Sequence, residues 1–180
     1  MKVVTALVFA AMSTVAMSSS ASATDLYMMD ESPMMAAHSD FDWNGFYVGV
    51  GKGFYFEPDD DEWAVGKILS IGVNFTSGNV LFGLEADGAL MCFVDGGCDW
   101  DQYIAGQGRI GVLTGSDTLI YGLAGVGLYM NNDAQFFQLG GGVEFAGNGD
   151  VTWRGEYAAF LFGGGFVGHQ ASLGVYWHLN

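Results

Sequence analysis

The chain has 180 residues, enough for one domain, and 51% of them are hydrophobic. Twenty acidic residues outnumber five basic ones, and the formal charge of −15 excludes a nucleic-acid partner because the chain would repel phosphate backbones. After residue 23, no segment offers the ~20 consecutive apolar residues that a membrane helix needs. Abundant glycine, scarce proline and alternating hydrophobic residues indicate strands.

The first 23 residues predict a secretory signal peptide. A basic start at Lys2, an apolar run over 3–17 and a small-residue site ending at Ala23 are typical of a segment that is cleaved during export. Cleavage there leaves four basic residues against twenty acidic ones, a formal charge of −16. Export together with alternating hydrophobicity predicts the outer membrane of a Gram-negative cell.

Residues 24–42 show no period and are acidic and rich in methionine. We expect a flexible periplasmic leader, since chain ends are usually poorly ordered. The alternative is a tail that binds soft copper ions through thioether and imidazole groups. Its candidate ligands are Met28, Met29, Met34, Met35 and His38.

The barrel domain is predicted to span 43–180, where eight segments approach the ~9–11 residues of a tilted membrane strand. The expected strands are Phe46–Phe56, Ala64–Phe75, Val80–Met91, Gln102–Thr114, Thr118–Met130, Ala134–Ala146, Val151–Phe162 and Gly168–Leu179.

The connections between these strands alternate in character. Those at 76–79, 115–117 and 147–150 are short turns of Gly, Asn, Asp, Ser and Thr. Two of the others, 57–63 and 92–101, are longer and acidic. Outer-membrane barrels have short periplasmic turns and longer outer loops, so both chain ends are expected in the periplasm.

The segment Val151–Leu161 shows a period of two most clearly: one phase is apolar and includes Trp153, whereas the other holds Arg154 and Glu156. Successive side chains of a strand point to opposite faces. A broad apolar face that recurs from strand to strand is typical of a transmembrane barrel with lipid outside and a polar lumen. The predicted fold class is an all-β, eight-stranded antiparallel up-and-down transmembrane β-barrel. The strand at 118–130 is ambiguous because both of its phases are largely apolar or glycine.

Four motifs stand out at 42–49, 82–87, 108–111 and 121–126; the most specific are Asp-Trp-Asn-Gly-Phe-Tyr-Val-Gly and Phe-Gly-Leu-Glu-Ala-Asp. They resemble those of the small outer-membrane porin-family proteins, the opacity-protein-like, OmpA/OmpX-type eight-stranded barrels. The resemblance implies a surface-exposed barrel with structural, adhesive or immunogenic roles, whose outer loops contact host or neighbouring surface molecules. The family usually ends on an aromatic residue recognised by the barrel-assembly machinery, whereas this chain ends Leu179-Asn180.

Charged residues on the polar phase of the strands predict a filled lumen, because side chains fill the interior of an eight-stranded barrel. Buried charges must pair, and two arginines facing four carboxylates predict a plug of bidentate ion pairs. The alternative is a narrow ion-conducting path. The expected lumen residues are Glu85, Asp87, Arg109, Glu144, Arg154 and Glu156, with Gln107 and Gln138 beside them.

Two lysines, Lys52 and Lys67, share the apolar phase of their strands. A hairpin that turns symmetrically about Asp59-Asp60 places them opposite each other. Like charges in that position destabilise a sheet, and a lipopolysaccharide phosphate between them would reverse the effect. The alternative is a bulge that shifts the register and turns one lysine into the lumen.

Cys92 and Cys98 flank a short loop of an exported chain and predict a disulfide, since zinc would need further ligands at matching spacing. We expect neither a cofactor nor enzymatic activity. His169 and Ser172 are three apart on one strand and so face opposite sides, and His178 lies near the periplasmic end.

The main alternative to a membrane barrel is a soluble, exported, lipocalin-like protein that binds a small apolar ligand. Such a barrel needs polar residues outside and an apolar cavity inside. Trp153 would then point inward, and Arg154 would be an ordinary surface charge.

Overall fold

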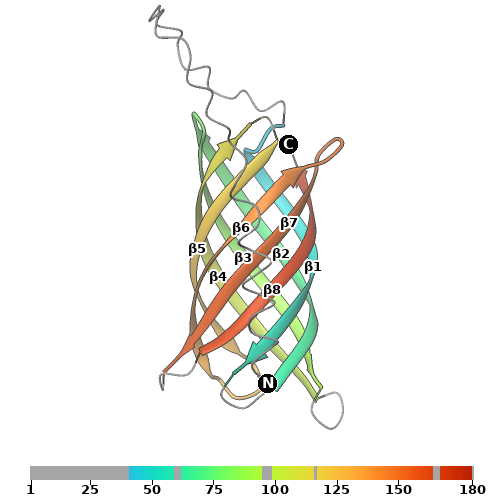
Figure 1. Cartoon of the computed structure of the whole chain (residues 1–180), viewed down its shortest axis with the longest axis vertical. Helices are drawn as coiled ribbons and strands as arrows, with labels where there is room; N and C mark the ends of the chain where they lie inside the picture. Colours follow the sequence, from blue (N-terminus) through green and yellow to red (C-terminus); the bar gives the residue numbers. More distant parts are fainter. Residues whose placement is uncertain (1–40, 59–61, 95–98, 116, 164–166, 180) are drawn as a thin grey trace, which may run out of the picture. The chain divides into compact units, whose positions relative to one another are not determined.

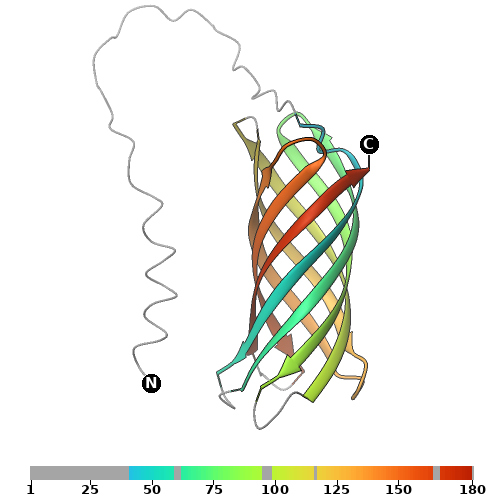
Figure 2. The same ribbon diagram turned by 90° about the vertical axis from the view of Figure 1, so that its right-hand side faces the viewer.

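A computed structural model describes residues 41–58, 62–94, 99–115, 117–163 and 167–179. Consecutive strands pair antiparallel, and the last pairs with the first, so that the sheet closes into an eight-stranded barrel. The strands wrap obliquely around it (Figures 1 and 2). The predicted fold class is confirmed. The strands are β1 (Gly45–Glu57), β2 (Glu62–Ser77), β3 (Val80–Phe93), β4 (Asp99–Thr114), β5 (Thr118–Tyr129), β6 (Gln135–Ala146), β7 (Val151–Phe162) and β8 (Val167–Leu179).

All eight predicted strands are present, but several extend further than expected. β1 and β2 stay paired as far as Glu57 and Glu62, and β3 and β4 as far as Phe93 and Asp99. The connections predicted at 57–63 and 92–101 are therefore shorter than expected, because backbone pairing continues past Phe56 and Met91. The connections at this end are 58–61, 94–98, 130–134 and 163–166.

The two ends of the barrel differ in how the chain reverses. We call one the turn end: it holds the three short turns, the start of β1 and the end of β8, which lie side by side through the pair Phe46–Leu179. The opposite end is the loop end. Each short turn contains a glycine with positive φ, at Gly78, Gly115 and Gly149, a conformation that a residue without Cβ adopts at little cost. In the part of the chain that the structure describes, no helix is long and apolar enough to cross a membrane.

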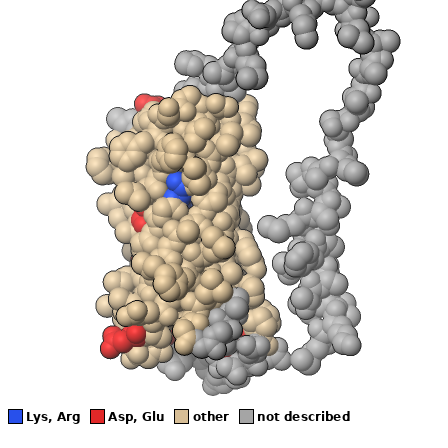
Figure 3. Space-filling model, turned by 90° about the vertical axis from the view of Figure 1, so that its left-hand side faces the viewer, with Lys and Arg blue, Asp and Glu red and all other residues tan. Residues whose placement is uncertain are grey.

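The alternation of side chains separates the lumen from the exterior. Leu84 is 62% exposed on the outside, whereas its neighbour Glu85 is 5% exposed and points inward. Aliphatic residues cover the middle of the outer wall, and charged residues occupy only small patches of the face drawn in Figure 3. Exposed aromatic residues lie toward the turn end (Phe46, Phe75, Phe82, Phe145, Trp153, Trp177) and toward the loop end (Phe54, Phe56, Trp63, Trp100, Phe137).

An apolar band between two aromatic girdles is the surface that a membrane-spanning barrel presents to lipid. Trp153 is 59% exposed and Arg154 is 3% exposed, so these side chains point as the membrane-barrel prediction requires. The lipocalin-like arrangement is wrong for this chain, because its exterior is apolar and its lumen is charged.

Candidate functional site

Four buried charged side chains from four strands meet in the lumen, and we call them the lumen quartet: Glu85 on β3, Arg109 on β4, Glu144 on β6 and Arg154 on β7. Arg154 lies at the centre, with Nε 2.9 Å from Glu144 Oε2 and Nη1 2.6 Å from Glu85 Oε2. Nη1 of Arg109 is 3.2 Å from the same Glu144 oxygen. Two cations therefore balance two anions, and all four residues are among those predicted to face the lumen.

Neutral side chains occupy the remaining acceptor positions of Glu85. Tyr47 donates its hydroxyl to Oε2 at 2.6 Å, and Gln107 donates Nε2 to Oε1 at 2.6 Å. Gln138 in turn donates to Gln107 Oε1 at 2.6 Å. A buried carboxylate is tolerated when its oxygens are paired and hydrogen-bonded in this way.

Tyrosine rings pack against both guanidinium groups. Arg154 Cζ lies 3.6 Å from the centroid of the Tyr176 ring, and Arg109 Cζ lies 5.0 Å from the ring centroids of both Tyr47 and Tyr121. A desolvated guanidinium over an aromatic face is stabilised by the ring quadrupole. The sequence interpretation missed this role of the tyrosines, although each lies on the inward-facing phase of its strand.

Asp87 and Glu156 point into the lumen but bind no arginine. Asp87 accepts a hydrogen bond from Ser70 at 2.6 Å, and Glu156 accepts one from Tyr121 at 2.6 Å. The predicted pairing of two arginines with four carboxylates is therefore wrong for these two, because their hydrogen bonds go to neutral hydroxyl groups. An interior cavity beside Asp87 and Glu156 has a volume of about 10 Å³, room for about one water molecule.

Aromatic side chains fill the lumen between this network and the loop end. The rings of Phe136 and Phe160 stack with centroids 4.7 Å apart, and Tyr103 packs edge-on against both, at 5.6 and 5.7 Å. Tyr55 and Tyr129 extend this layer to β1 and β5. Ring contacts therefore link β1, β4, β5, β6 and β7 at this level of the lumen.

A second group of rings closes the turn end. Trp43, just before β1, is 2% exposed, and its ring lies 4.9 Å from that of Phe41 and 5.8 Å from that of His178. His178 Nε2 is 3.5 Å from Glu144 Oε1, which links this group to the lumen quartet. Side chains thus lie in the lumen toward both ends and in the middle.

The predicted lysine pair lies on the outer surface. Lys52 is directly opposite Lys67 in an unbroken register that runs from Gly45 to Glu57, and both lysines are exposed. The symmetrical hairpin is confirmed. The alternative of a bulge that turns one lysine into the lumen is wrong.

The histidine and serine candidates His169 and Ser172 lie on opposite faces of β8. His169 faces outward beside Tyr157, whose hydroxyl is 2.7 Å from its Nδ1, while Ser172 lies on the lumen phase. Across the described ranges, no group of three His, Cys, Asp or Glu side chains could hold a metal ion. Cys92 lies near the end of β3 and is not a free thiol. Cys98 lies outside the described residues, so the disulfide remains a prediction.

The predicted signal peptide and almost all of the Met-rich leader also lie outside the described residues. This applies to the cleavage site at Ala23 and to the copper-ligand candidates Met28, Met29, Met34, Met35 and His38. Both stay predictions.

A closed barrel with an apolar outer wall, two aromatic girdles and a charged, packed lumen defines a small eight-stranded transmembrane β-barrel. Solved structures of outer-membrane proteins share this fold. Ail, the attachment invasion locus protein of Yersinia pestis, matches with a TM-score of 0.54 and 13% identity over 76% of this chain and 97% of its own. Neisserial surface protein A matches with a TM-score of 0.53 and 17% identity over 75% and 97%.

A de novo designed transmembrane β-barrel matches with a TM-score of 0.52 and 13% identity, over 77% of this chain and 98% of its own. No family model and no curated protein matches the sequence. The likeness thus concerns the fold, which a designed barrel shares with natural surface proteins.

Proposed function

We propose that this protein is an integral outer-membrane barrel with a structural or surface-interaction role, and that the lumen quartet and the two aromatic layers close its lumen. The observation that supports the proposal is the combination of an apolar, girdled exterior with charged and aromatic side chains in the lumen. A packed lumen leaves no path for solutes, so neither conduction nor catalysis inside the barrel is expected.

In this proposal the signal peptide is removed near Ala23, the barrel-assembly machinery inserts the chain, and the loop end faces the cell exterior. The loop end is acidic: its connections and their flanks carry acidic residues at 57–62, 95–101 and 133, and no Lys or Arg. A surface of one sign attracts partners of the opposite sign. A surface-interaction role would thus involve cationic groups of a host or neighbouring molecule.

Membrane fractionation combined with gel mobility before and after boiling tests the location and the fold. We expect the protein in the outer-membrane fraction, with a folded form that migrates differently from the heat-unfolded form. Recovery in the soluble fraction after removal of the outer membrane would contradict the proposal.

Binding of the intact cell-surface protein to polycationic and polyanionic surfaces at low and high salt tests the surface role. Selective, salt-sensitive binding to the polycation supports it, since exposed charges act over about 10 Å at 0.1 M salt. Equal binding to both surfaces would contradict the surface-interaction role, and only the structural role would remain.

A further inference from the structure

The lysine pair is unusual for its position on the outer wall. Among the described strand residues, Lys52 and Lys67 are the charged side chains that face outward, and neither contacts a described acidic group. Their neighbours on the outer face are apolar: Leu173 lies opposite Lys52 on β8, and Leu90 lies opposite Lys67 on β3. Two like charges facing each other in apolar surroundings destabilise the wall unless an anion lies between them.

The depth of the pair suits a lipid headgroup. The girdle pair Phe56–Trp63 near the loop end lies four residues along the strands from Lys52–Lys67. At ~3.3 Å per residue and a strand tilt of ~40°, the lysines start about 10 Å below that girdle. Long lysine side chains extend toward the interface from such a position, so their ammonium groups reach the headgroup layer of the leaflet at the loop end.

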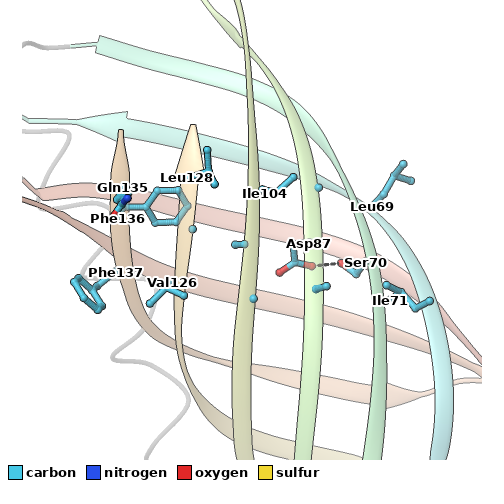
Figure 4. A pocket seen from close by; sticks show the side chains of 15 residues that line it. Leu69, Ser70, Ile71, Asp87, Ile104, Val126, Leu128, Gln135, Phe136 and Phe137 are labelled. Atoms are coloured by element: carbon cyan, nitrogen blue, oxygen red, sulfur yellow. Dashed lines mark hydrogen bonds between the residues drawn. The ribbon is translucent and has the colours of Figure 1, made fainter. Parts of the chain in front are cut away.

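A largely apolar hollow, whose lining also includes Ser70, Asp87 and Gln135, begins near the same lysines. Leu69 follows Lys67 by two residues and pairs with Gly88, and together they border a hollow of about 790 Å³ on the outer wall of β2 to β6. Its floor contains Gly88 and Gly106, where an added Cβ would meet no atom within 4 Å. Figure 4 shows the side chains around it, which include Leu69, Ile71, Ile104, Val126, Leu128 and Phe137.

These two features are arranged like the two parts of a phosphorylated lipid. We propose that a lipopolysaccharide molecule binds here, with a phosphate of its lipid anchor between Lys52 and Lys67 and an acyl chain in the hollow. The phosphate accepts charge-assisted hydrogen bonds from both ammonium groups and removes their repulsion. The hollow adds contact with the acyl chain, because its glycine floor lets the acyl chain approach the protein backbone.

Lipopolysaccharide is the occupant because the site lies in the half of the wall nearer the loop end, which the proposed function places in the outer leaflet. The site rests on that orientation, but not on a closed lumen or a surface partner. A failure of the conductance or cell-surface binding tests would therefore leave the lipid site unaffected.

The experiment measures binding of purified lipopolysaccharide to the refolded mature protein in detergent micelles, with folding checked by heat-dependent gel mobility. We expect Lys52→Gln combined with Lys67→Gln to weaken binding about tenfold or more, the loss of at least one charge-assisted contact. Arginine at both positions should keep the affinity, because it retains both charges.

The hollow is tested by a matched pair of variants on β4. Gly106→Leu fills the floor of the hollow and should weaken binding severalfold, whereas Gly108→Leu points outward two residues away, beyond the hollow, and should not. Neither added Cβ meets a protein atom within 4 Å, so both variants should fold.

Two ligand controls distinguish the source of the phosphate. Lipopolysaccharide stripped of its anchor phosphates should bind as weakly as the double glutamine variant binds the intact molecule. Phosphatidylglycerol, which has a phosphate but a different chain arrangement, should bind less tightly than lipopolysaccharide. Equal affinity for phosphatidylglycerol, or an unchanged affinity of the double glutamine variant, would overturn the proposal.

Discussion

Replacement of Arg154 by Met tests whether the lumen quartet holds the barrel closed. Met keeps much of the side-chain volume but removes the contacts to Glu144 at 2.9 Å and to Glu85 at 2.6 Å. The two carboxylates are then left with Arg109, whose Nη1 is 3.2 Å from Glu144 but 3.9 Å from Glu85. Removing one partner of a buried ion pair costs about 3–5 kcal/mol, because a charge stays buried without compensation.

A double variant separates this charge effect from lost packing. Arg154→Met combined with Glu85→Gln leaves one balanced pair, Arg109 with Glu144, and Gln can still bond to Tyr47. We expect the double variant to be about 2 kcal/mol more stable than the single one, since the uncompensated carboxylate is gone while the lost hydrogen bonds, worth about 1 kcal/mol each, are not restored.

The assay is denaturant unfolding of the refolded protein in micelles, followed by tryptophan fluorescence and gel mobility. Glu156→Gln serves as the control, because Glu156 accepts a hydrogen bond from Tyr121 and binds no arginine; we expect a change within about 1 kcal/mol. If the single and double variants unfold at the same denaturant concentration, the stability of the barrel does not depend on charge balance in the lumen, and the reasoning fails.

Three further outcomes are expected. Mass spectrometry of non-reduced peptides should find Cys92 joined to Cys98, with a stabilisation of about 2 kcal/mol at most from so short a loop; two free thiols would refute the pairing. In planar bilayers the unmodified protein should conduct poorly, and large, stable channels would show that the lumen is open. Gly72→Ala should destabilise by about 1–3 kcal/mol, because its Cβ would overlap the Tyr47 ring, whereas Gly108→Ala, whose Cβ meets no atom within 4 Å, should change stability by less than about 0.5 kcal/mol. Equal effects of the two alanines would contradict the packing described for the lumen.

The sequence by itself determined which side chains face lipid and which face the lumen. The pleat of a strand imposes a period of two, so the phase of Trp153 and Arg154 could be assigned without knowledge of the neighbours. The same rule placed Lys52 and Lys67 on the outside, and hairpin symmetry set them opposite each other. Short turns that contain glycine separated the strands, and the number of strands, eight, predicted a closed barrel.

Only the tertiary structure decided how the inward side chains combine across the barrel. Arg154 meets Glu85, 69 residues away in the chain, because closure between β1 and β8 and the stagger of the strands bring β3 and β7 to one level. Strand period carries no information about that stagger, so Asp87 could not be distinguished from Glu85 as an arginine partner. The ambiguous strand β5 was settled by its neighbours, which turn Tyr121 inward and Val126 toward lipid. Pairing across a lumen depends on the registers of all the strands together, and these follow from closing the whole sheet.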